Sequence, residues 1–283
     1  MSDQDTPQPR KGKPILGEKK RLEERRKFLR SIVLAGGGVT AALLGIVPTV
    51  GAWEPRLRPP GALAENKFLA SCIKCGQCVQ VCPVEAIRLA DLLDGYGLGT
   101  PFIDARAQAC EFSCDGLQCV LACPTGALTH DIAYPHQVRI GFAEVARPQK
   151  CLAMLGQGFK GRIRDEAFSG KFRYTEINRW NPLPVRDQTF DLEICDLCVR
   201  HCPIEIRIAQ CAQGKPPSGD KNQCPPTRAI GLEAMHGGDG GKRMKPVVYE
   251  GCVGCGACEM VCPTEPAAIV VDMTKNADTV RKA

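Results

Sequence analysis

Polar and apolar positions divide the chain into segments of different character. Residues 1–30 are polar and basic, and an uncharged, mildly apolar stretch runs from Ser31 to Trp53. Beyond it the apolar runs are short: VEAIRLA, TGALTH and EPAAIVV each follow closely after a Cys-Pro pair. We expect each of them to begin with a turn or helix start and to lead toward a small strand. Their recurrence indicates an internally duplicated α+β chain.

The composition limits how such a chain can be held together. It has 283 residues, 18 cysteines and only 5% aromatic side chains, which indicates a modest apolar core for this length. Ten of the 37 Lys and Arg residues and five of the 31 Asp and Glu residues lie in residues 1–52, so the net charge of +6 is mainly an N-terminal feature. The remainder lacks the basic face with stacking aromatics that nucleic-acid binding needs, and we expect no nucleic-acid partner.

Fifteen of the cysteines fall in four runs, and each run ends in Cys-Pro. The first and fourth have the spacing C-x2-C-x2-C-x3-C-P, and the second is looser. The third has only three cysteines, with Leu192 where its first is expected. The runs are Cys72, Cys75, Cys78, Cys82; Cys110, Cys114, Cys119, Cys123; Cys195, Cys198, Cys202; and Cys252, Cys255, Cys258, Cys262.

This spacing is a signature of bacterial [4Fe–4S] ferredoxins. Soft thiolates suit iron, a short loop with a cysteine every third residue can wrap one corner of the cube, and the last cysteine then serves the other cluster of a pair. A disulfide framework would spread its cysteines along the chain. Tetrahedral zinc would need fewer of them at these intervals. We therefore predict iron–sulfur clusters rather than either alternative.

The third run needs a ligand from elsewhere, and three cysteines lie outside the runs: Cys151, Cys211 and Cys224. Cys151 is upstream, on the side where the ligand is missing, and a long loop between two ligands costs little extra closure entropy. Cys224 begins a Cys-Pro pair of its own and is an alternative to Cys202. A disulfide between Cys211 and Cys224 is the other use that the sequence favours.

The segments RLRPPGALAENKF, CIKCGQCVQVCP, GTPF and CEFSCDGLQCVLACPTGAL resemble the NapG/MauM family of ferredoxin-type proteins. The resemblance runs from Arg25-Arg26 to about Gly156 and resumes over residues 195–203 and 250–271. Members carry a third motif whose first cysteine stands apart from the others. The resemblance therefore implies that Cys151 is the displaced ligand and that residues 152–194 are an insertion.

Crossed ligation, as in two-cluster ferredoxins, predicts four complete [4Fe–4S] sites. Sixteen cysteines are then used as cofactor-binding iron ligands. The first set is Cys72, Cys75, Cys78 and Cys123; the second is Cys110, Cys114, Cys119 and Cys82; the third is Cys151, Cys195, Cys198 and Cys262; the fourth is Cys252, Cys255, Cys258 and Cys202.

The fold expected from these sites is α+β, with two tandem bacterial-ferredoxin-like 2[4Fe–4S] modules after an N-terminal signal segment. We place the signal in residues 1–52, the first module in 53–150, the displaced ligand and insertion in 151–194, the second module in 195–275 and a tail in 276–283. The basic flank and the glycine-diluted apolar stretch resemble a twin-arginine export signal. Residues 50–52 offer a small-residue cleavage site, and a retained membrane anchor is the alternative.

The insertion holds six of the 15 aromatic side chains of the chain, interleaved with Lys and Arg. This content suits a protein docking surface, and a loop that packs its rings on its own module is the alternative. His201, beside Cys202, has the position of a residue that tunes a cluster, but an ordinary surface histidine is the more common case. We identify no catalytic residues.

The function implied by the resemblance is electron transfer. A NapG-like protein would be exported to the periplasm, associate with the membrane, and pass electrons from a NapH-type quinol-oxidising partner to a periplasmic redox enzyme. A MauM-like role in the maturation of a periplasmic amine dehydrogenase is the alternative, and a third is the iron–sulfur subunit of a larger oxidoreductase. These functions need the same clusters, and the cysteine spacing does not separate them.

Overall fold

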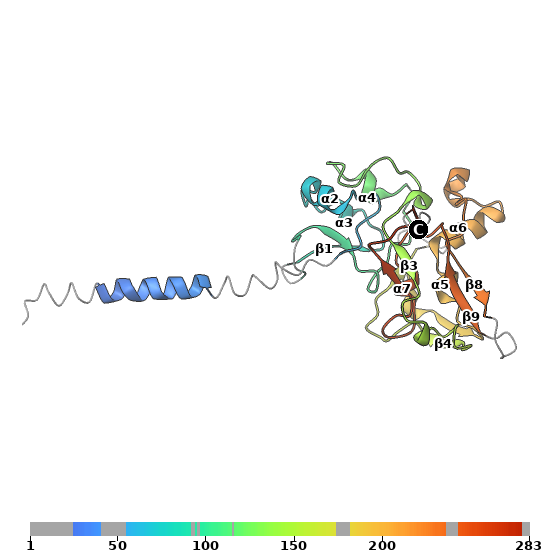
Figure 1. Cartoon of the computed structure of the whole chain (residues 1–283). Coiled ribbons are helices and arrows are strands. Elements are labelled where there is room, and N and C mark those ends of the chain that lie inside the picture. The colour runs from blue at the N-terminus through green and yellow to red at the C-terminus, as the bar shows by residue number, and fades with distance from the viewer. Residues whose placement is uncertain are drawn as a thin grey trace, which may run out of the picture. The chain divides into compact units, whose positions relative to one another are not determined.

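The computed structural model describes residues 25–40, 55–91, 94, 97–114, 116–173, 182–235 and 243–278 (Figure 1). The contacts divide the chain into two compact units, Met1–Trp53 and Glu54–Ala283. The two expected ferredoxin-like modules therefore share the larger unit, and their division at residue 150 stays a prediction.

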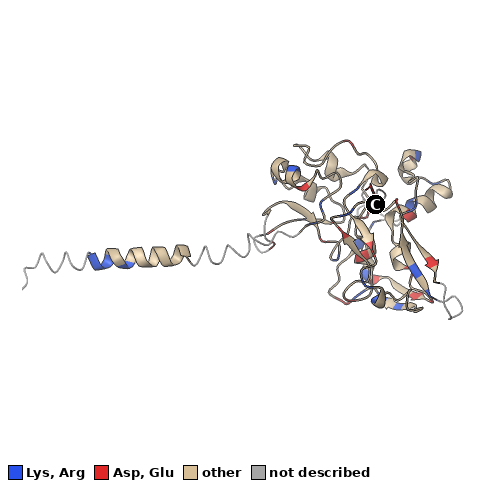
Figure 2. Cartoon of the chain, in the orientation of Figure 1, with Lys and Arg blue, Asp and Glu red and all other residues tan. Residues whose placement is uncertain are grey.

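In the first unit, residues 25–40 are helical and their side chains are exposed. Lys and Arg residues are concentrated at the beginning of this helix (Figure 2). Among the helices of the described residues, none combines the length and the apolarity needed to cross a membrane. The expected cleavage site at residues 50–52 lies outside the described residues, and the export signal stays a prediction.

The first cysteine runs of the larger unit lie among short elements. Their helices are α2 (Glu65–Ser71), α3 (Gln77–Gln80) and α4 (Gln118–Leu121), with the 3-10 turns η1 (Pro135–Gln137) and η2 (Pro148–Lys150). Strands β1 (Ile87–Leu89) and β2 (Pro101–Ile103) pair antiparallel. The strand expected from VEAIRLA is thus confirmed. TGALTH forms only the isolated bridge Ala62↔Leu128, because its backbone bonds to the RPPGAL segment instead.

The later runs lie among two four-residue helices, one ten-residue helix and two five-residue strands. The helices are α5 (Leu197–Arg200), α6 (Pro203–Ala212) and α7 (Ala257–Met260), with the 3-10 turns η4 (Pro217–Gly219) and η5 (Lys221–Gln223). Strands β8 (Ile230–Ala234) and β9 (Met244–Val248) form an antiparallel hairpin. Strand β10 (Val270–Asp272) confirms the strand expected from EPAAIVV. It pairs with β3 (Phe142–Glu144), so a strand before the insertion joins the end of the chain (Figure 1).

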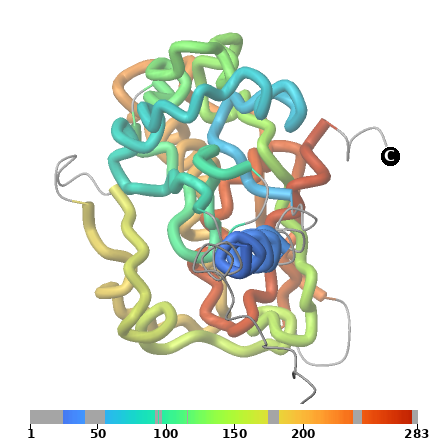
Figure 3. The backbone as a smooth tube through the Cα atoms, turned by 90° about the vertical axis from the view of Figure 1, so that its left-hand side faces the viewer, coloured from blue at the N-terminus to red at the C-terminus, as the bar shows by residue number. Residues whose placement is uncertain are grey.

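The insertion forms two small antiparallel pairs, β4 (Phe159–Arg162) with β7 (Thr189–Leu192), and β5 (Lys171–Phe172) with β6 (Leu183–Pro184). The turn η3 (Val185–Asp187) joins the second pair to the first. Figure 3 traces this segment in yellow-green to yellow. The pairing brings the ends of the insertion together, and Cys195 N–H donates to Gln157 O over 3.2 Å. The insertion therefore leaves and re-enters the fold at one place.

The core is assembled from small apolar side chains and cysteines rather than from a large layer of rings, as the composition predicts. The expected tail is partly attached. Ala277 is buried, Asp278 forms an ion pair with Arg139 over 3.5 Å, and Lys275 bridges Glu144 and Asp272. Ala277 and Asp278 of the expected tail therefore contact the rest of the larger unit.

Candidate iron–sulfur sites

Each cysteine run folds into the same local turn. A short helix begins at or just before the third cysteine of a complete run and ends just before the last: α3 holds Cys78, α4 holds Cys119 and α7 holds Cys258. Gly76, Leu117 and Gly256 precede these helices with a positive φ, which turns the loop back over its own cysteines. In the third run α5 holds Cys198.

Three of the four expected sets line cavities. The first set, Cys72, Cys75, Cys78 and Cys123, lines one cavity with Phe68 and Leu128. The third set, Cys151, Cys195, Cys198 and Cys262, lines a second. The fourth set, Cys252, Cys255, Cys258 and Cys202, lines a third. Among the described residues, no three His, Cys, Asp or Glu side chains converge on a point where a single metal ion would bind.

The second set is brought together as well. Burial raises the pKa of Cys110 and of Cys119, and the neighbouring Cys114 and Cys82 raise both further. Cys82 also raises the pKa of Cys114, after burial. The structure therefore collects one cysteine from the first run and three from the second, as crossed ligation requires. That these sixteen cysteines are iron ligands stays a prediction.

The chemistry of the four sets fits a cationic metal cluster. Burial raises the pKa of Cys78 and of Cys195 to about 11, and the pKa of Cys202 to about 12. Four thiolates held side by side repel one another, so the ionised form needs positive charge among them. Iron supplies that charge and binds thiolates in preference to thiols. The sets suit the ligation of a [4Fe–4S] cluster by its four cysteines.

Backbone N–H groups are aimed at several of the sulfurs. Ala86 donates to Cys82 Sγ over 3.2 Å, Leu128 to Cys123 Sγ over 3.5 Å and Ala268 to Cys262 Sγ over 3.3 Å. Such bonds favour the thiolate and are one of the levers that set cluster potential. At Cys123 burial opposes ionisation, but the hydrogen bond from Leu128 helps to lower the pKa of the thiol.

Cys202 differs because a ten-residue helix follows it. It is the N-cap of α6, which begins at Pro203. Backbone bonds from Glu205 and Ile204 lower the pKa of its thiol, although burial outweighs them. The helix start thus takes the place of the N–H donor that follows the last cysteine in the other runs.

The cysteines outside the runs have separate places. Cys151 is buried in the third set, where the missing ligand is expected. Cys211 and Cys224 form a disulfide, which confirms the pairing that the sequence favours. Because Cys224 is bonded there, it does not replace Cys202 in the fourth set.

His201 is not an ordinary surface histidine, and that expectation is wrong. Its ring stacks on Phe172, with ring centroids 5.0 Å apart, and meets the edge of Phe190 at 5.5 Å. Burial, with Arg200 nearby, lowers its pKa to about 4. Phe168 and Phe172 are buried. The described rings of the insertion therefore pack on their own chain, which favours the packing alternative; Tyr174 and Trp180 lie outside the described residues.

The structure adds two buried charged residues that the cysteine spacing does not reveal. Glu111 follows Cys110 directly and accepts the backbone N–H of Arg173 over 2.7 and 2.8 Å; burial raises its pKa to about 7. Arg207, on α6, donates to Gln223 over 2.8 Å and to Phe112 O over 2.5 Å. Their only signal in the sequence is a charged side chain close to ligand cysteines.

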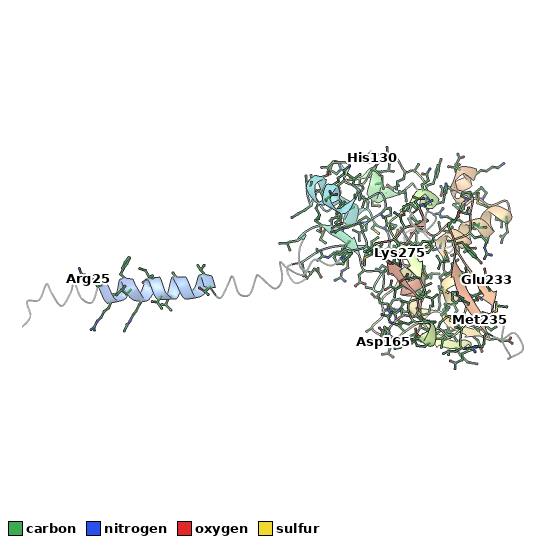
Figure 4. All side chains as sticks on the ribbon, viewed as in Figure 1. Arg25, His130, Asp165, Glu233, Met235 and Lys275 are labelled. Atoms are coloured by element: carbon green, nitrogen blue, oxygen red, sulfur yellow. A yellow bond between two sulfur atoms is a disulfide. The ribbon has the colours of Figure 1, made fainter. Side chains whose placement is uncertain are left out.

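The other histidines have no common site. His130 is exposed at the surface (Figure 4), and His136 stacks on Tyr134 with ring centroids 5.7 Å apart. His236 lies outside the described residues. The described part of the chain thus offers no cluster of histidines near the cysteine sets.

Comparison with known proteins agrees with the cysteine pattern. Residues 71–127 match the 4Fe-4S dicluster domain and residues 245–266 match the 4Fe-4S binding domain. The ferredoxin-type protein NapG of Escherichia coli is 34% identical over 253 residues, which cover 87% of this chain and 84% of NapG. The methylamine utilization ferredoxin-type protein MauM of Paracoccus denitrificans is 34% identical over 261 residues, which cover 89% of this chain and 90% of MauM. No solved structure matches the chain.

Proposed function

Because the chain belongs to the NapG and MauM family of ferredoxin-type proteins, we propose that it relays single electrons through four [4Fe–4S] clusters. Such clusters supply one-electron redox chemistry when bound. The residues of the chain hold them, shield them from water and set their potentials. The observation that carries the proposal is the collection of sixteen cysteines into four sets of four, three of which line cavities.

A relay fits these sets better than catalysis does. Four cysteines per cluster leave no open iron position where a substrate would bind. The groups that surround the cavities of the third and fourth sets are apolar, among them Ile269, Ala229 and Ile230. Apart from the cysteines, the residues that line these two cavities include no Asp, Glu, His, Lys or Arg that could act as a catalytic acid or base.

The two ends of the relay come from the NapG-like function. We assign the electron donor to a NapH-type quinol-oxidising membrane protein and the acceptor to a periplasmic redox enzyme. Export by the twin-arginine route would deliver the chain with its clusters already in place, since clusters are assembled where thiols stay reduced.

The first test is the iron content of the protein purified without oxygen. Four clusters correspond to about 16 irons and about 16 acid-labile sulfides per chain. The reduced protein should then pass electrons to an oxidised acceptor in stopped-flow mixing. About eight irons per chain would mean that only two clusters bind, which would limit the proposed relay to one module. Full iron content with no electron transfer would refute the function and leave the sites intact.

A MauM-like role in maturation is the second candidate, because MauM of Paracoccus denitrificans matches this chain at the same identity as NapG of Escherichia coli. Affinity purification of the tagged chain from gently solubilised membranes separates the two. A quinol-oxidising membrane partner with a periplasmic reductase supports the relay. An amine dehydrogenase precursor with its maturation factors supports the second role.

A further inference from the structure

The ligand loops of the two modules touch directly. Cys110, of the second set, donates its backbone N–H to the carbonyl oxygen of Cys255, of the fourth set, over 3.2 Å. The preceding residue, Ala109, donates its N–H to Met260 Sδ over 3.2 Å. We call the contact between residues 105–110 and residues 254–262 the module seam. One hydrogen bond thus joins a cysteine of the second set to a cysteine of the fourth set.

Arg106 fastens this seam. Its Nη1 donates to the carbonyl oxygens of Glu259 and Cys262 over 2.7 and 2.8 Å, and its Nη2 donates to Thr264 O over 2.8 Å. The same Nη2 bonds to the Glu265 carboxylate over 2.8 Å. These carbonyls lie in and just after the segment that connects Cys258, a ligand of the fourth set, to Cys262, a ligand of the third set. A side chain of the first module therefore fixes the ligand turn of the second.

A glycine permits the close approach. Gly256 has a φ of +85°, and a Cβ placed on it would lie 2.5 Å from Ala105 Cβ. Gly76 occupies the same place in the first run, with a φ of +74°, but a Cβ there would meet only Leu89 Cδ1 at 4.0 Å. The two glycines share their backbone requirement. Only Gly256 also faces the other module.

The insertion covers the second set beside the seam. Gln108 exchanges two hydrogen bonds with the Lys171 backbone, over 2.8 and 2.9 Å, and Glu111 accepts the Arg173 N–H. Arg164 Nη2 also donates to Arg106 O over 2.6 Å. Gln108 and Glu111, on either side of Cys110, are therefore both hydrogen-bonded to the insertion. A covered contact excludes water, which lowers the reorganisation that accompanies a change of charge.

We propose that electrons cross between the modules at the Cys110–Cys255 contact, with Arg106 as the residue that positions it. The four sites then act in the order first, second, fourth, third, although this is not their order in the sequence. An electron that leaves the second site reduces the fourth, so one cluster is oxidised as the next is reduced. Tunnelling slows steeply with distance, which favours the place where ligands of two sites touch. This inference rests on the proposed relay function.

The order makes the first and third sites the ends of the relay. The first set includes the exposed Cys75, with Ile73 and Lys74 exposed beside it, so this end reaches the surface. At the seam Cys255 is buried and Cys110 is half-buried. A partner can therefore exchange electrons with the first site without disturbing the crossing.

The test compares Gly256→Ala with its matched control Gly76→Ala in the intact holoprotein. Both substitutions strain a left-handed glycine, but only the first pushes the seam apart. Hydrogen exchange of the peptide that contains Cys110 reports whether the seam has opened. Pulsed electron paramagnetic resonance of the fully reduced protein reports magnetic coupling among the clusters. We expect Gly256→Ala to accelerate exchange of the Cys110 peptide and to weaken the magnetic coupling between the two modules, while Gly76→Ala, whose strain falls in the ligand loop of the first set, leaves both of these unchanged.

Two results would overturn the inference. One is an opened seam in Gly256→Ala with unchanged coupling across the modules. The other is an equal loss of coupling in Gly76→Ala, which would trace the effect to glycine strain and not to the seam. If Gly256→Ala fails to load iron, Arg106→Gln decides by the same two measurements. Intact coupling in a protein that fails to transfer electrons to an acceptor would refute the relay and retain the cluster order.

Discussion

Cys151 and Cys195 line the same cavity although the whole insertion separates them along the chain. The pairing of β4 with β7 makes this approach possible, since it closes the insertion at its base. Cys151 is buried there, and Cys262 lies close enough to raise the pKa of its thiol, after burial. The displaced cysteine therefore has the position of a full member of the third set.

Replacing Cys151 tests that membership. We expect Cys151→Ala to lose about four irons per chain, because a cube held by three thiolates exposes its fourth iron to solvent and the whole cluster then breaks down. Iron and acid-labile sulfide are measured on protein purified without oxygen. Cys224→Ala is the matched control, since its sulfur is bonded to Cys211, and it should keep the full iron content. Unchanged iron in Cys151→Ala would remove it from the ligand set.

The disulfide should stabilise the loop after α6 without contributing to iron binding. Breaking the Cys211–Cys224 bond with a Cys211→Ser, Cys224→Ser double variant should lower the free energy of unfolding by about 3 kcal/mol, because a short closed loop is released in the unfolded chain. Thermal unfolding of the holoprotein measures the loss. Two alkylatable thiols in the native wild-type protein would show that the bond does not form.

His201 should contribute through packing. His201→Ala removes the ring between Phe172 and Phe190 and should lower the free energy of unfolding by about 1–2 kcal/mol. His201→Phe, which keeps a flat ring, should recover most of that loss. The exposed His130 provides the control, and His130→Ala should leave thermal unfolding unchanged. Equal effects of the two alanine variants would contradict the packing role.

Arg58 should stabilise the first module more than an exposed arginine does. Its side chain is only 7% exposed and bonds to Glu65, Thr100 and Pro101 O. We expect Arg58→Ala to cost about 2–3 kcal/mol, since partners in a partly buried network are left unsatisfied. Arg88 is the comparison, because its ion pair with Asp104 is 3.8 Å long and exposed. Denaturant unfolding should show a loss of less than about 0.5 kcal/mol for Arg88→Ala.

The cysteine spacing predicted which sulfurs come together because the ligand geometry is local. A run of eleven residues needs only its own turn and helix start to aim three cysteines at one point. The pairing of Cys211 with Cys224 could be predicted from the sequence for the same reason, because the two cysteines lie close together along the chain. The position of the displaced Cys151 required the family resemblance as well, since a ligand so far along the chain has no local signal.

Other features depend on contacts between distant segments. The environment of His201 is set by Phe172 and Phe190 of the insertion, so its neighbour Cys202 suggested a different role. The pairing of β3 with β10 and the bonds of Arg106 join residues more than a hundred positions apart. The pattern of polar and apolar residues does not identify such partners, because the same side chains are also common on solvated surfaces.

The crossed sets also determine the order in which the cysteine sets are completed during translation. The ribosome completes the first and second sets once Cys123 has emerged, but Cys151 must wait for Cys262, near the end of the chain. Cys202 likewise waits for Cys252, Cys255 and Cys258. Strand β3 lacks its neighbour until Val270–Asp272 is made. If the proposed sets bind clusters, the first half of the protein can acquire metal while translation continues, whereas both clusters of the second half must wait for residues 252–262.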